Sequence, residues 1–176
     1  MGGVAFGTTD KGYFGGGYTN IQANLDEKIL VKDLYEYSPA TDSWGRGAAA
    51  PFLPEETGAF QPFVLANSTP LLITANKTYE FKPASGAFAD FGISASASEL
   101  CFTIGKFVYY GLNGNSSLAT IDTEAKLRGN NSSLPASATA RKDGLVFVIG
   151  KKAYFGTGVG GDSKTLFNDM YEFSIP

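Results

Sequence analysis

Short apolar runs separated by glycine-rich or polar turns recur along the chain. Residues 4–15 (VAFGTTDKGYFG) contain an apolar run, a turn and a second run that ends in two aromatic residues and a glycine. Residues 101–111 (CFTIGKFVYYG) and 145–156 (LVFVIGKKAYFG) follow the same order. Runs of four or five residues in this pattern are typical of β-strands, and no helical period of useful length is present. Each segment is therefore predicted to form a β-hairpin.

A second motif follows the hairpins. Residues 33–39 (DLYEYSP) match residues 168–174 (NDMYEFS), and residues 77–83 (KTYEFKP) fit both. The turn sequences PATD and PASG come next, and they are rich in the residues that tight turns require. A fourth short strand is predicted after each of these turns, at residues 43–46 and 86–90.

The two middle copies are less regular. In the hairpin at residues 63–74, Leu72, Ile73 and Thr74 stand in place of the aromatic pair and the glycine. The third-strand motif is weak at residues 118–122. Four copies of about 44 residues, each with about four short strands, predict the blades of a β-propeller. We expect a single domain over residues 1–176, with repeats at about 4–57, 58–97, 98–140 and 141–176.

These repeats resemble the kelch repeats of galactose-oxidase-like propellers, and most closely the tandem kelch units of secreted bacterial proteins. The resemblance rests on KGYFGGG at 11–17, DLYEYSP at 33–39 and TDSW at 41–44, and on residues 150–158 and 169–173 of the last copy. It implies an all-β fold, a kelch-type β-propeller with about four blade-like four-stranded repeats, either open or part of a larger ring. It also implies an extracellular or periplasmic location, which the residues themselves do not indicate.

The last repeat departs from the family pattern because it stops after its third strand, at Ile175 and Pro176. Propellers of this kind close their ring by combining strands from both termini in one blade. The alternatives are a fragment of a larger ring, a small open propeller, or half of a ring that a second chain completes. Unpaired strand edges promote pairing, so a homo-oligomer formed through the blade edges is one expectation.

Two residue counts exclude several kinds of chemistry. The chain has no histidine, which removes His-dependent hydrolases and His-ligated copper or zinc sites, including the copper chemistry of galactose oxidase. The single cysteine, Cys101, lies in an apolar run and is expected to be a small buried residue. We therefore expect no catalytic residue, no cofactor and no metal. A net charge of −3 without a basic run argues against nucleic acid, and the lack of a long apolar run argues against membrane insertion.

A ligand site is expected on the loops. In kelch propellers ligands meet the loops that join strands two and three and the loops that join blades, which lie on one face. The longest such loop is predicted at residues 18–32, and a shorter one at 159–167. Arginine and acidic side chains in such loops suit a carboxylate, a sugar hydroxyl or a peptide. The candidate ligand-binding residues are Tyr18, Asn20, Arg46, Glu55, Arg141, Lys142 and Asp162.

The function predicted from these features is a non-catalytic binding or scaffold module that engages a protein or a glycan through one propeller face. One alternative is a carbohydrate-active enzyme of galactose-oxidase-like fold without copper. Another is a structural propeller that assembles with itself. Each candidate residue also has a simpler interpretation, since a charged loop residue is more often part of a solvated rim than of a binding site.

Overall fold

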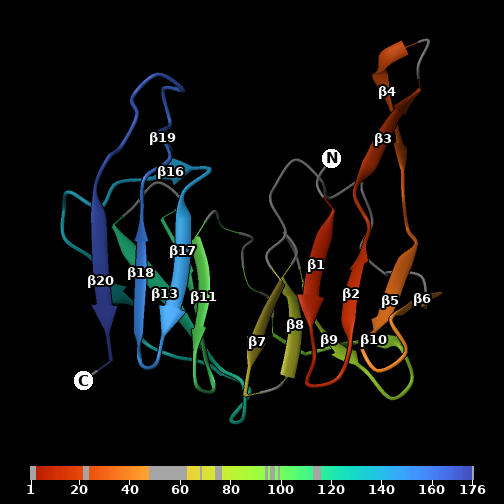
Figure 1. Ribbon diagram of the computed structural model, residues 1–176. Helices are drawn as coiled ribbons and strands as arrows, with labels where there is room; N and C mark the ends of the chain where they lie inside the picture. The colour runs from red at the N-terminus through yellow and green to blue at the C-terminus, as the bar shows by residue number, and fades with distance from the viewer. Residues whose placement is uncertain are drawn as a thin grey trace. The chain divides into compact units, whose positions relative to one another are not determined.

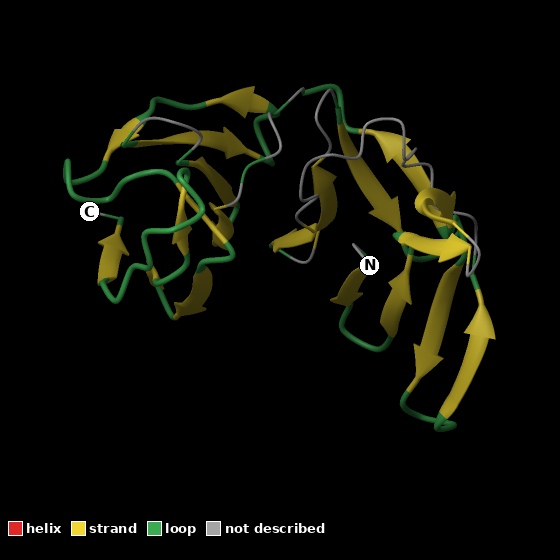
Figure 2. Ribbon diagram, turned by 90° about the horizontal axis from the view of Figure 1, so that it is seen from above, coloured by secondary structure: helices red, strands yellow, loops and turns green. Residues whose placement is uncertain are grey.

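The computed structural model describes residues 3–21, 24–47, 63–67, 69–73, 77–93, 95, 98, 100–112 and 116–175. Within these ranges every regular element is a strand, as Figure 2 shows. The chain divides into two compact units, Met1–Phe63 with Ser68–Ala95, and Val64–Asn67 with Ser96–Pro176. The first two predicted repeats therefore fall almost wholly in the first unit, and the last two in the second.

The first sheet has the order β1-β2-β5-β6 (Figure 1). Its strands are β1 (Val4–Gly7), β2 (Gly12–Gly15), β5 (Leu34–Ser38) and β6 (Ser43–Arg46). All neighbouring strands are antiparallel. This confirms the predicted hairpin, third strand and fourth strand of the first repeat.

The second sheet has the order β10-β9-β8-β7. Its strands are β7 (Phe63–Ala66), β8 (Thr69–Ile73), β9 (Thr78–Lys82) and β10 (Ala87–Asp90). The pairing corrects the predicted alignment, because Leu71 lies opposite Glu80 as Tyr13 lies opposite Glu36. Leu71, and not Leu72, is the counterpart of Tyr13. A continuous apolar run has no polar alternation to fix its register, so the sequence pattern gave a shift of one residue.

The third and fourth sheets belong to the second unit. The third contains β11 (Leu100–Ile104), β12 (Phe107–Gly111), β13 (Ser117–Asp122) and β14 (Leu127–Arg128), with β15 (Ser132–Ser133) also paired to β13. The last contains β17 (Leu145–Ile149), β18 (Lys152–Gly156) and β20 (Met170–Ser174), in the order β17-β18-β20. Among the described residues this sheet has three strands, which agrees with the predicted departure from the four-strand pattern.

The segment predicted as the loop 18–32 is mostly a β-hairpin. Strands β3 (Tyr18–Ile21) and β4 (Asn24–Leu30) form a two-stranded sheet of their own, with an irregularity between Asn20 and Ile21. The N–H of Val31 donates to the carbonyl of Gly17 at 2.9 Å at its base. The prediction of a loop was wrong because a connection of this length can pair with itself and so satisfy its own backbone groups.

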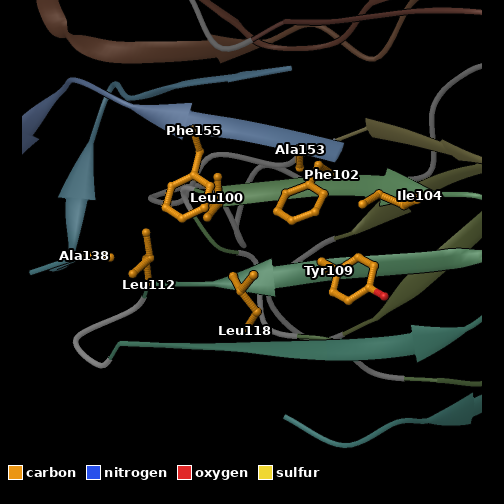
Figure 3. Close-up of a cluster of buried hydrophobic side chains, with 9 residues drawn as sticks. All are labelled: Leu100, Phe102, Ile104, Tyr109, Leu112, Leu118, Ala138, Ala153 and Phe155. Atoms are coloured by element: carbon orange, nitrogen blue, oxygen red, sulfur yellow. The ribbon is translucent and has the colours of Figure 1, made fainter. Parts of the chain in front are cut away.

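The core of the second unit lies between its two larger sheets. Figure 3 shows nine buried side chains of this cluster, including Leu100, Phe102 and Ile104 from β11 and Phe155 from β18. Cys101 on β11 is buried as expected, and this burial raises the pKa of its thiol. In the first unit, one buried cluster is built from Tyr13, Leu34 and Phe81. Burial, and next the charge of Glu36, raise the pKa of Tyr13 to about 12.

The glycine after each aromatic pair allows a close backbone approach. A Cβ on Gly15 would lie 2.1 Å from the carbonyl oxygen of Asp33, and one on Gly156 would lie 2.2 Å from that of Asp169. Real Cβ atoms do not tolerate such distances, because the atoms would overlap. This glycine therefore lets the second strand approach the residue before the third strand closely.

The residue after this glycine has a left-handed backbone, with φ of 69° at Gly16, 62° at Leu112 and 57° at Thr157. A β-branched residue is strained there.

Thr157→Gly is expected to raise the free energy of unfolding by about 0.5 kcal/mol, because the relief of strain exceeds the added entropy of the unfolded chain. Urea denaturation measures this change. Leu112→Gly is the matched control and should lose stability, since its side chain is buried; stabilisation by both substitutions would contradict this account.

Candidate functional site

Three of the predicted ligand-binding residues lie together at one end of the last sheet. Strand β16 (Arg141–Lys142) pairs with β19 (Val159–Gly160), so that Arg141 faces Gly160 and Lys142 faces Val159. Asp162 lies in the turn that follows β19. Figure 1 shows this small ladder above β17 and β18, at one end of the last sheet.

Arg141 is held by several groups. Its Nε donates to the carbonyl of Thr139 at 3.2 Å, and one Nη donates to the carbonyl of Thr157 at 3.1 Å. The guanidinium also donates to both carboxylate oxygens of Asp169, at 2.5 and 3.1 Å. It lies over the ring of Phe167, with 4.4 Å between Cζ and the ring centroid. Only 4% of this side chain is exposed, so it joins three chain segments and has few donors left for a ligand.

The ion pair between Arg141 and Asp169 sets the charge state of both groups. The hydrogen bond from Arg141 holds the pKa of the Asp169 carboxyl below its usual range. The hydrogen bond to Asp169 likewise raises the pKa of Arg141. Both groups are therefore charged at neutral pH, and neither is suited to proton transfer.

Asp162 stabilises its own turn. Its Oδ1 accepts hydrogen bonds from the backbone N–H of Lys164 and of Thr165, each at 2.9 Å, and its Oδ2 accepts one from the Thr165 hydroxyl at 2.7 Å. These bonds, led by the one from the Thr165 amide, lower the pKa of Asp162 to about 2. In the described part of the chain no group of three potential ligands is placed to hold a metal ion.

The first unit contains a comparable ion pair. Arg46 at the end of β6 donates to Asp33, which precedes β5 as Asp169 precedes β20. In contrast to Arg141, the side chain of Arg46 is 71% exposed. Arg46 is therefore the guanidinium of the two that remains accessible to a ligand.

The side chains of the other three predicted residues are not described by the structure. Tyr18 and Asn20 lie on β3, where the structure describes the backbone but not their side chains. Glu55 lies outside the described residues. The ligand-binding role of each candidate stays a prediction.

Asp33 and Asp169 were not predicted as the partners of Arg46 and Arg141. A signal was present, because an aspartate stands directly before the third strand in both the first and the last repeat. The arginine comes from a different place in each repeat, 13 residues after Asp33 and 28 residues before Asp169. A fixed spacing motif therefore does not identify the pair.

A small apolar hollow adjoins Arg141. It is lined by Leu100, Leu112, Leu145 and Phe155 together with Gly144, Gly156 and Arg141 itself. Its volume is about 230 Å³ when the space open to solvent is included. Most of this space is open to solvent, and the enclosed part holds no more than about one water molecule, which is too little to enclose a ligand.

The arrangement of antiparallel sheets, in which successive strands lie side by side, matches a known architecture. The chain is similar to the solved structure of YjhT, a bacterial kelch-repeat β-propeller protein, with a TM-score of 0.73 over 98% of this chain and 68% of YjhT. The chain has a kelch β-propeller fold. The sequence identity is 12%, so the kelch likeness concerns the fold alone. No family model and no curated protein matches the chain.

Among the residues that the structure describes, no helix is long and apolar enough to cross a membrane.

Proposed function

We propose that this kelch chain is a non-catalytic binding or scaffold module. Its ligand, a protein or a glycan, meets the segments that join the second and third strands of its sheets. The observation that carries the proposal is the β3–β4 hairpin, which extends beyond the end of the first sheet in Figure 1. A rigid scaffold that presents such a segment is a common arrangement for binding.

The base of this hairpin supports the proposal. It is held by the hydrogen bond from Val31 to Gly17 and by the ion pair between Arg46 and Asp33. Because Asp33 orients the exposed guanidinium of Arg46, less entropy is lost when a ligand oxygen binds there. Arginine in a fixed orientation suits a carboxylate or a sugar hydroxyl.

The charge states of the acidic groups favour binding over catalysis. A general acid that works at neutral pH needs a raised pKa. In the described part of the chain the carboxyl groups with a shifted pKa are all shifted downward, chiefly by hydrogen bonds from backbone amides or from Arg and Lys. These groups are Asp90, Asp122, Asp162, Asp169 and Glu172.

Arg46→Gln tests the proposal. The wild-type chain is screened against arrayed glycans and peptides, and the best hit is titrated with both chains. Loss of one charge-assisted hydrogen bond is expected to raise Kd about tenfold, while the melting temperature stays close to that of the wild type. The matched control Arg128→Gln changes an exposed arginine on β14 and should leave Kd unchanged.

Two results would contradict the proposal. One is equal affinity of Arg46→Gln and the wild type for every hit. The other is turnover of an arrayed sugar that Arg46→Gln abolishes, which would favour the enzyme alternative.

A further inference from the structure

An aromatic contact in the first unit joins two successive sheets. Phe6 on β1 stacks on Tyr13 on β2, with ring centroids 4.8 Å apart and an angle of 15° between the rings. Phe81 on β9 of the following sheet packs edge-on against both, 5.2 Å from Phe6 and 4.8 Å from Tyr13. The stacked pair is thereby covered by one aromatic residue from a third strand.

The second unit repeats this contact with different residues. Phe102 on β11 stacks on Tyr109 on β12 at 5.3 Å and 16°. Phe173 on β20 packs edge-on against them, at 5.7 Å from Phe102 and 5.0 Å from Tyr109. Edge-on packing against a stacked pair is a favourable arrangement of aromatic rings. Two independent examples show how one sheet of this chain packs on the next.

The last sheet has the same stacked pair, and no aromatic ring among the described residues packs edge-on against it. Phe147 on β17 stacks on Tyr154 on β18 at 5.3 Å and 19°, yet Phe147 is 40% exposed. Leu145, Ile149 and Met170 are exposed large apolar residues on the same face, by the pairing of the three strands. We name this face, made of Leu145, Phe147, Ile149, Tyr154 and Met170, the socket.

The first sheet carries the complementary group. Tyr37 follows Glu36 on β5 as Phe81 follows Glu80 on β9, so Tyr37 has the position of the covering residue. The ring centroids of Tyr37 and of Trp44 on β6 are 5.1 Å apart, and those of Phe81 and of Phe88 on β10 are 5.0 Å apart. Unlike the half-buried Phe88, Trp44 is 61% exposed.

Two further residues on this face of the first sheet are exposed. Phe14 has the same place in β2 as Phe155 has in β18, but Phe14 is 53% exposed whereas Phe155 is 1% exposed. Tyr35, the cross-strand neighbour of Phe14, is exposed as well. We name Phe14, Tyr35, Tyr37 and Trp44 the knob.

We infer that the socket of one copy of this chain receives the knob of a second copy. The contact copies the one that the chain already makes twice within itself, with Tyr37 in the place of Phe81 or Phe173. The knob and the socket are different patches, so the contact is head-to-tail, and it either closes into a ring or continues as a filament. It uses the faces of the sheets, whereas the sequence pattern predicted pairing through strand edges.

The polar groups of the socket are compatible with this contact. Lys152 donates to Glu172 at 2.7 Å beside Tyr154, and Lys11 donates to Glu36 at 2.5 Å beside the covered Tyr13. The face of the first sheet that Phe81 covers therefore already contains a Lys–Glu ion pair like the one beside the socket. Exposed apolar patches of this kind mark interaction sites.

Light scattering over a range of concentrations tests the inference on the whole chain. The wild type is expected to exceed the monomer mass, whereas Phe147→Glu and Trp44→Glu are each expected to be monomeric. An equimolar mixture of these two variants is expected to give a dimer, because the first keeps its knob and the second keeps its socket. Leu166→Glu, at a position that is 77% exposed and belongs to neither face, is the control and should keep the wild-type mass.

A monomeric wild type over the whole range would overturn the inference and would leave a further kelch repeat or another protein as the occupant. A mixture that stays monomeric would overturn the head-to-tail contact. Far-UV circular dichroism verifies that both variants fold, and Phe147→Ala and Trp44→Ala replace them where the charge prevents folding. Ligand binding measured on Phe147→Glu keeps this test separate from that of the proposed function.

Discussion

Gly15→Ala is expected to destabilise the chain by about 3 kcal/mol or more. The new Cβ would lie 2.1 Å from the carbonyl oxygen of Asp33 and 2.8 Å from the Cα of Leu34. Both are backbone atoms, so no side chain can move aside to make room. Either β2 or the start of β5 must shift, and the hydrogen bond from Gly16 to Asp33 weakens with it. Urea denaturation of the two chains measures the difference.

Gly45→Ala is the matched control in the same sheet. A Cβ on Gly45 would meet no atom within 4 Å. Because alanine restricts the unfolded chain more than glycine does, the substitution is expected to be neutral or stabilising by up to about 1 kcal/mol. Equal losses for Gly15→Ala and Gly45→Ala would show that the backbone approach at Gly15 is not what requires glycine.

The second large effect is expected for Arg141→Gln, with a loss of about 3 kcal/mol or more in the free energy of unfolding. The variant leaves the carboxylate of Asp169 without its cation and the carbonyls of Thr139 and Thr157 without donors. The exposed pair of Arg46 and Asp33 provides the control, since Arg46→Gln is expected to change stability by less than about 1 kcal/mol.

The pH dependence gives an independent check on this pair. Arg141 lowers the pKa of Asp169 in the folded chain. The ion pair therefore adds stability above the unfolded-state pKa of about 4, and this contribution is lost as the pH falls through the folded-state pKa. Stability of the wild type should fall below about pH 4 more steeply than that of Arg141→Gln. Parallel curves for the two chains would contradict a stabilising role for the pair.

The repeats and their strand order were predictable because turn residues and aromatic-glycine motifs mark each hairpin in the sequence. The register of β8 was not, since Leu71, Leu72 and Ile73 are all apolar and all buried. The β3–β4 hairpin was missed for a related reason. Its position between the second and third strands indicated a loop, and length alone does not say whether such a connection pairs with itself.

The candidate site was predictable in part. Arg141, Lys142 and Asp162 share one end of the last sheet, as the loop positions suggested. The burial of Arg141 was not readable from the sequence, because it depends on Asp169 and Phe167, which are distant from Arg141 along the chain. The exposure of the aromatic faces was not predictable either, since Phe14 and Phe155 both stand in a Tyr-Phe-Gly motif but only Phe155 is buried.

Because Cys101 is buried, the reactivity of its thiol reports local opening of the fold. Cys101 carries the single thiol of the sequence and lies on β11. A thiol that is closed to solvent reacts with a disulfide reagent only in molecules whose strand has transiently opened. The labelling rate of the unaltered protein therefore measures how often the third sheet opens, without any engineered probe.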